Sequence, residues 1–137
     1  MKLLHLIFFA LLLFACNASK KSAANTHPLD GNWIPIRQEI GGKNLPQTVY
    51  EKYKLIITDT LYSYGTYEID HGALLYKDGK MDIYGRYGVN MGKHYTAIYK
   101  MENGQLVICC NLKGDSYPAA FETTSKPTLF LSVYKKE

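Results

Sequence analysis

The chain has few of the features that mark nucleic-acid-binding, redox or membrane-spanning proteins. Its 16 Lys and Arg residues are scattered, so the basic patch that a nucleic-acid surface needs is missing. The 3 cysteines include a neighbouring pair but no C-x-x-C spacing, which argues against a redox or metal site. The longest apolar run, Leu3–Phe14, is shorter than the about 20 residues of a spanning helix. We therefore expect no nucleic-acid partner, no cofactor and no metal.

Signatures of catalysis are also missing. A glycine-rich loop, Gly85–Lys93, fails the phosphate-binding pattern, because Tyr87 replaces its first glycine and His94 its Ser or Thr. No H-E-x-x-H spacing is present, and no serine has the surroundings of a nucleophile elbow. Asp70 and His71 are neighbours on a predicted strand, so their side chains should point to opposite faces. The pattern favours a protein that is not an enzyme.

From Leu29 onward the chain predicts short β-strands without helical alternation. The clearest hairpin joins His94–Met101 to Gln105–Asn111 across Asn103-Gly104, which suits a type I′ turn. One face of this half-buried pair is apolar, and Cys110 on it should be buried. The two-residue loop sets these residues opposite each other: Met101 and Leu106, Tyr99 and Ile108, and Ala97 and Cys110.

A second hairpin is expected at Asp78-Gly79. A strict two-residue loop would set Lys77 against Lys80, which favours a wider loop. About eight strands at short spacing indicate a barrel or a sandwich. Further strands are predicted at Asn32–Ile40, Lys54–Thr58, Leu61–Glu68 and Leu129–Lys135, and a short helix only at Pro46–Tyr53.

The first sixteen residues are typical of an export signal, with Lys2, an apolar run, and a small residue before Cys16. The ending Leu13-Phe14-Ala15-Cys16 resembles the lipobox of bacterial lipoproteins, in which the signal is cut before the cysteine and the cysteine carries lipid. Phe14 departs from the small residue usual there, and ordinary cleavage after Ala18 is the alternative.

The lipoprotein resemblance divides the chain into a signal peptide at 1–15, a flexible polar tether at 16–28 and one folded domain at 29–137. It implies a partner, the membrane, reached through lipid on Cys16. It also implies a location in the bacterial cell envelope, facing the periplasm or the exterior.

The folded domain opens with Gly31-Asn32-Trp33, as the G-x-W motif opens lipocalin barrels. The resemblance implies an all-β, antiparallel, up-and-down barrel of about eight strands, with at most one short helix. It also implies that the barrel binds a ligand, and that Lys135 or Lys136 supplies a cation above Trp33. The domain is similar to small bacterial lipocalin-like domains along an ordered series of stretches: 29–33, 42–46, 81–85, 88–93, 97–99, 106–109 and 118–123.

We expect the domain to be a monomer that binds a small apolar or amphipathic ligand. Arg86, in the glycine-rich loop, is the candidate to grip an anionic ligand group. Tyr84, Tyr99 and His94 are further candidate contacts, since tyrosine joins an apolar ring to a polar hydroxyl. Two alternatives stay open: a structural or interaction lipoprotein with a filled barrel, and an envelope hydrolase that depends on Asp82 or His94.

Overall fold

The computed structural model describes residues 27–67 and 70–137. The predicted signal peptide, Cys16 and the tether up to residue 26 lie outside the described residues. Within the described ranges, no helix has the length and apolar character that a membrane span requires.

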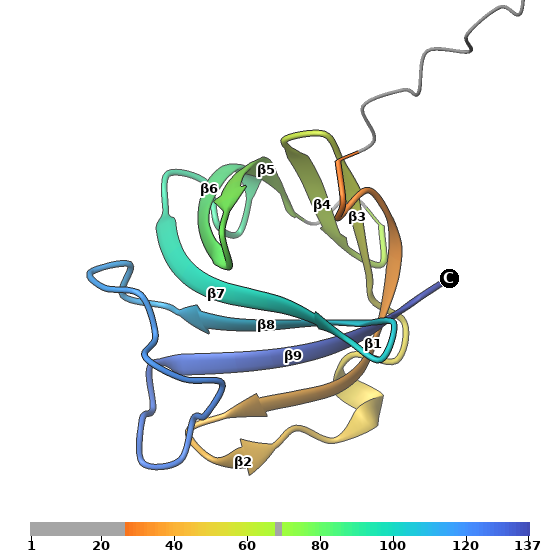
Figure 1. The fold of residues 1–137 in the computed structure, drawn as a ribbon. Helices are drawn as coiled ribbons and strands as arrows, with labels where there is room; N and C mark the ends of the chain where they lie inside the picture. The colour runs from red at the N-terminus through yellow and green to blue at the C-terminus, as the bar shows by residue number, and fades with distance from the viewer. Residues whose placement is uncertain (1–26, 68–69) are drawn as a thin grey trace, which may run out of the picture.

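Nine strands form one antiparallel sheet that closes on itself (Figure 1). Because β1 pairs with β9 as well as with β3, all strands except β2 close an eight-stranded barrel. The all-β, lipocalin-like barrel expected from the sequence is confirmed. The elements are β1 (Gly31–Ile40), β2 (Lys43–Asn44), the 3-10 helix η1 (Gln47–Val49), β3 (Lys54–Thr58), β4 (Leu61–Gly65), β5 (Asp70–Lys77), β6 (Lys80–Gly88), β7 (His94–Glu102), β8 (Gln105–Asn111) and β9 (Leu129–Lys136).

The β7–β8 hairpin has the predicted register, with Ala97 paired to Cys110, and Cys110 is buried. The register of the β5–β6 hairpin corrects an expectation. Lys77 pairs directly with Lys80 across Asp78-Gly79, so the turn is the strict two-residue loop that like charges were expected to disfavour. Both lysines are exposed, where water and salt screen their repulsion.

The outer face of β8 is buried, whereas the sequence predicted a half-exposed hairpin. Val107 and Cys109 on this face pack with Leu131 of β9 in a second apolar cluster. Phe121, from the long β8–β9 connection, covers them. The connection is fastened to the turn between β1 and β2 through Thr123, whose hydroxyl oxygen accepts a hydrogen bond from the Gly42 amide at 2.8 Å. Cys109 and Cys110 are both free, buried thiols. A disulfide between sequence neighbours in a strand would need a strained geometry.

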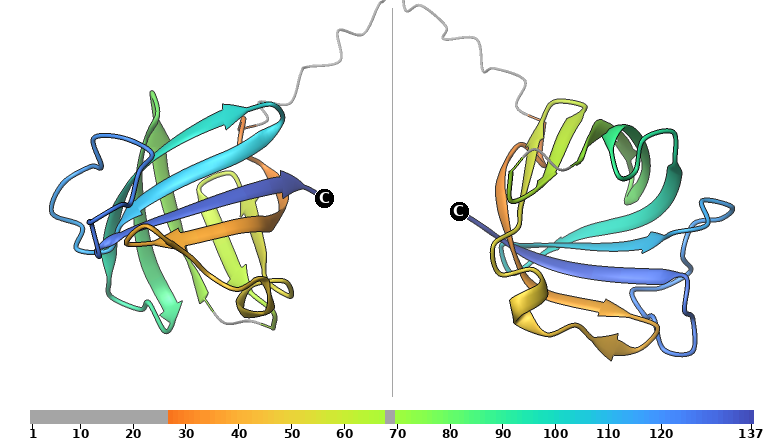
Figure 2. Two further views of the ribbon diagram at one scale, coloured as in Figure 1. Left: turned by 90° about the horizontal axis from the view of Figure 1, so that it is seen from below. Right: turned by 180° about the vertical axis from the view of Figure 1, so that it is seen from behind.

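The two ends of the barrel carry different connections between strands. The long β8–β9 connection lies at one end, and the C-terminus and the β7–β8 turn lie at the other (Figure 1 and Figure 2). In an up-and-down barrel the β4–β5 and β6–β7 connections share the end of the β8–β9 connection.

Trp33 closes the barrel end at which the C-terminus lies. Its ring is 1% exposed, and Nε1 donates a hydrogen bond to the Leu29 carbonyl at 2.8 Å. Lys136 supplies the expected cation, with Nζ 5.4 Å from the ring centroid. Gly31 has φ +143°, and a Cβ there would lie 2.7 Å from Cε of Lys136. Glycine at this position thus lets the lysine lie across the strand.

Candidate functional site

A cavity of about 190 Å³ lies inside the barrel, away from the Trp33 end. Inward-facing aliphatic side chains of β5, β6 and β8 form much of its wall, among them Leu74, Met81 and Ile108. Five aromatic residues also line it: Tyr62, Tyr64, Tyr95, Phe130 and Tyr134. The cavity is therefore a largely apolar, aromatic-rich chamber.

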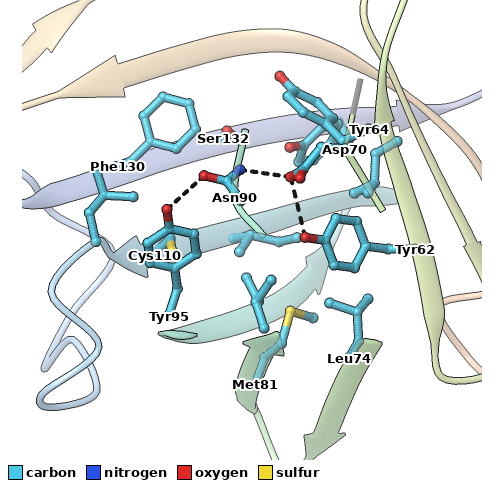
Figure 3. A pocket seen from close by; sticks show the side chains of 15 residues that line it. Tyr62, Tyr64, Asp70, Leu74, Met81, Asn90, Tyr95, Cys110, Phe130 and Ser132 are labelled. Carbon is cyan, nitrogen blue, oxygen red and sulfur yellow. Dashed lines mark hydrogen bonds between the residues drawn. The ribbon is translucent and has the colours of Figure 1, made fainter. Parts of the chain in front are cut away.

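One polar cluster projects into this chamber (Figure 3). Asn90 Nδ2 donates to Asp70 Oδ2 at 2.7 Å, and the Tyr62 hydroxyl donates to the same oxygen at 3.3 Å. The Tyr95 hydroxyl donates to Asn90 Oδ1 at 2.7 Å. A chain of hydrogen bonds thus joins β4, β5, β7 and the β6–β7 connection around one carboxyl group.

The glycine-rich loop delivers Asn90 to this cluster. The loop folds back on β6 through two backbone hydrogen bonds, from Gly92 N to Gly85 O at 2.9 Å and from Gly85 N to Lys93 O at 3.0 Å. A Cβ on Gly85 would lie 1.8 Å from the Asn90 carbonyl oxygen. Only glycine leaves room for this close approach, so Gly85 is the residue that allows Asn90 to reach Asp70.

Two polar atoms of the cavity wall have no hydrogen-bond partner among the described residues. They are Asp70 Oδ1 and Ser132 Oγ, on side chains of residues that are 3% and 2% exposed. Buried polar atoms are normally paired, and leaving one unpaired costs about 1–3 kcal/mol. Asp70 Oδ1 and Ser132 Oγ are therefore the positions on the cavity wall at which a bound molecule could make hydrogen bonds.

Burial sets the ionisation of the surrounding groups. It raises the pKa of the Tyr62 hydroxyl, which the nearby Asp70 carboxylate raises further. Burial likewise raises the pKa of Tyr95, and those of Tyr64 and Cys110 to about 12. At neutral pH these phenols are therefore uncharged donors, and Cys110 is a thiol rather than a reactive thiolate.

The four residues predicted as ligand contacts do not line the cavity. Tyr84 and Arg86 lie on the outer face of β6 and are exposed. His94 is also outside, stacked on Tyr84 with ring centroids 4.6 Å apart. Tyr99 points inward but lies near the closed end, packed edge-on against Tyr76 at 5.7 Å. A role for these residues in ligand binding stays a prediction, and the cavity does not support it.

The expected separation of Asp70 and His71 is confirmed. Asp70 is buried in the barrel, whereas His71 packs against Tyr87 at 5.6 Å between ring centroids. From the sequence, Asp70 was considered only as a possible acid–base partner of His71. Neither Asn90 nor Ser132 was predicted as a site residue. Tyr95 was one of several strand tyrosines of which two or three were expected to line a cavity, but it was not chosen as a ligand contact, although the predicted register put it on the apolar face with Ala97 and Tyr99.

The structure does bring Asp82 and His94 together, on the outside of the barrel. His94 Nε2 lies 2.7 Å from Asp82 Oδ1, and the Tyr117 hydroxyl donates to Asp82 Oδ2 at 2.6 Å. The hydrogen bond from Tyr117, followed by that from His94, lowers the pKa of the Asp82 carboxyl. Among the described residues, no group of three His, Cys, Asp or Glu side chains is placed to hold a metal ion.

No protein-family model matches the chain, and a search of curated proteins finds no match either. The cavity and its lining residues are therefore the features of this protein that bear on its function.

Proposed function

We propose that this protein binds a small, largely apolar molecule inside its barrel, and that it does so in the bacterial cell envelope, anchored through lipid on Cys16. The observation that carries the binding proposal is the cavity of about 190 Å³ with its two unpartnered polar atoms. A folded protein gains stability by filling such a space with side chains, so a retained cavity with polar groups favours an occupant.

The cavity volume restricts the size of this occupant. An apolar protein cavity of about 150 Å³ accepts benzene, and drug-sized ligands occupy about 300–1,000 Å³. At about 190 Å³, the chamber suits one six-membered ring with a short side chain, or an aliphatic chain of similar bulk.

The hydrogen bonds of Asp70 favour binding over catalysis. Its carboxyl group is held by Tyr62 and Asn90, and in the described part of the chain it makes no hydrogen bond to a serine, cysteine or histidine nucleophile. The chamber also counts against the alternative of an interaction protein with a solid interior.

The proposed anchor is supported by the sequence alone. Intact-mass analysis of protein isolated from membranes of the native host would detect it. We expect a chain that begins at Cys16 and carries acyl mass. An unmodified chain beginning at Ser19 would show ordinary cleavage and overturn the anchor, while leaving the binding proposal standing.

Methyl NMR of the folded domain tests the binding proposal, with propylbenzene as the probe. We expect titration to shift the methyl resonances of Leu74, Ile83 and Ile108, which line the cavity. Leu106 and Ala97 belong to the same apolar core but do not line the cavity, and they serve as internal controls.

Saturable shifts confined to the cavity methyl groups support the proposal. Absence of any shift up to the solubility limit of the probe, or shifts only at exposed residues such as Leu75 and Val89, would overturn it.

A further inference from the structure

The Asp70 carboxyl group is satisfied on one side only. Oδ2 accepts two hydrogen bonds, from Asn90 and Tyr62, while Oδ1 accepts none and is buried. In the described part of the chain, Asp70 also takes part in no salt bridge. A carboxylate buried in an apolar chamber is costly unless a cation or strong donor meets it.

We propose that the natural occupant of the cavity is a small organic cation, a primary or secondary ammonium group on an apolar body, whose N–H donates to Asp70 Oδ1. This inference rests on the proposed function and names the chemical class of its ligand. Such a ligand supplies both the missing donor and the missing counter-charge.

The aromatic wall also favours a positive charge. Tyr64 lies directly opposite Asp70 in the β4–β5 register. The Tyr62 hydroxyl donates a hydrogen bond to Asp70. Tyr95, Phe130 and Tyr134 complete an aromatic lining. The face of an aromatic ring is electron-rich and attracts ammonium groups, an attraction that grows when water is excluded. A carboxylate ligand would instead face both an electron-rich wall and the like charge of Asp70.

Ser132 provides a second polar atom on the cavity wall that has no partner among the described residues. It lies on β9, paired with Ile108 of β8, and its Oγ is unpartnered and buried. A hydroxyl oxygen accepts as well as donates, so it suits a second N–H of the ammonium group. A primary or secondary ammonium has at least two N–H donors, whereas an alcohol has one.

A series of isosteric probes tests this inference by calorimetric titration. The series is phenethylamine, 2-phenylethanol, propylbenzene and 3-phenylpropionate, which carry a cation, a neutral donor, no donor and an anion on similar apolar bodies. We expect phenethylamine to bind at least tenfold tighter than propylbenzene or 2-phenylethanol, and 3-phenylpropionate to bind weakest.

Two cavity variants and one surface variant test which side chains cause the preference for phenethylamine over the uncharged probes. Asp70→Asn keeps the shape of the side chain and removes its charge, and we expect it to reduce phenethylamine affinity at least tenfold and to change propylbenzene affinity much less. Ser132→Ala should reduce phenethylamine affinity severalfold. Asp59→Asn removes the same charge from an exposed side chain at φ +59°, which asparagine tolerates, and should change neither affinity.

The outcomes separate this inference from the proposed function. If propylbenzene or 2-phenylethanol binds as tightly as phenethylamine, or if Asp70→Asn keeps the preference for the amine, the ligand is not a cation and the inference fails while the cavity proposal stands. If none of the four probes binds the wild-type protein, both fail. Retained propylbenzene binding by Asp70→Asn shows that this variant is folded.

Discussion

The closed end of the barrel is filled by side chains, whereas the other half encloses the cavity. At the closed end, the Trp33 indole N–H has its acceptor in Leu29 and Lys136 lies over the ring, while the Tyr76 hydroxyl is buried without a partner among the described residues. In the hollow half, Asp70 Oδ1 and Ser132 Oγ have no partner in the described structure, although both residues are as deeply buried as the core.

This difference divides one sheet into a packed half and a hollow half. Side-chain packing around Trp33 contributes dispersion and burial of apolar surface, the main sources of stability in a small domain. The hollow half has less side-chain packing and leaves acceptors without hydrogen bonds, which costs free energy in the unliganded state. A ligand that fills the chamber would add both the missing packing and the missing hydrogen bonds, so ligand binding would also stabilise the fold.

The largest effect is expected from removing the closing side chain. Trp33→Ala should lower the free energy of unfolding by about 3–5 kcal/mol, since it deletes a fully buried aromatic ring and leaves a cavity. Urea unfolding followed by circular dichroism measures this, because the chain has only 1 Trp and fluorescence would be lost. A loss below about 1 kcal/mol would contradict the assignment of this end as the stabilising one.

Trp33→Phe is the matched control for that experiment. It keeps an apolar ring and loses only the hydrogen bond to Leu29 and part of the volume, so its loss should be smaller. Because Trp33 does not line the cavity, its affinity for propylbenzene should equal that of the wild type. A changed affinity would show that the two halves are not independent.

Ionisation of Cys110, on the wall of the hollow half, should produce the next largest effect. Burial raises its thiol pKa from 9.0 to about 12 in the folded protein, so folding favours the protonated thiol. Its contribution to stability is complete below the unfolded pKa of 9.0 and is lost as the pH rises from there toward 12. The free energy of unfolding should therefore fall with rising pH in this window, by at most about 1.4 kcal/mol per pH unit from this group.

Cys110→Ala should flatten this slope between pH 9 and 10, measured by urea unfolding at each pH. Cys109→Ala is the matched variant from the outer face of β8. Burial also raises the pKa of Cys109, but a backbone hydrogen bond from Glu122 and the charge of Lys126 oppose the rise. Cys109→Ala should therefore flatten the pH dependence of the free energy of unfolding less than Cys110→Ala does. Equal slopes in wild type and Cys110→Ala would contradict a buried, protonated thiol on the cavity wall.

Local patterns predicted the strands and the closed end well. The Asn103-Gly104 turn fixed the β7–β8 register because a type I′ turn leaves no freedom in pairing. The G-x-W motif needs only the three residues 31–33, so it could be recognised in the sequence. The structure adds that Lys136, rather than Lys135, is the cation above Trp33. The covered face of β8 was missed, because a connection that folds back over a strand has no periodic signature.

The cavity was harder to predict because its polar residues meet only when the barrel closes. Asp70 and Asn90 are 20 residues apart, and their contact depends on the fold-back at Gly85. A signal for the outward position of Tyr84 and Arg86 was nevertheless present. Met81 and Ile83 alternate with them along β6 and face inward, so strand periodicity alone puts Tyr84 and Arg86 outside.

The smallest effect is expected from the outer-face residues that the sequence proposed for ligand binding or catalysis. His94→Ala removes a partly exposed contact to Asp82 and a stacked partner of Tyr84, and exposed pairs of this kind contribute about 0–1 kcal/mol. We expect a loss in that range by urea unfolding, and phenethylamine affinity within twofold of wild type by calorimetry. Arg86→Ala, from the same outer surface, should behave alike. If either substitution abolished binding while Asp70→Asn did not, the ligand would bind outside the barrel, and the hollow half would be a packing defect rather than a site.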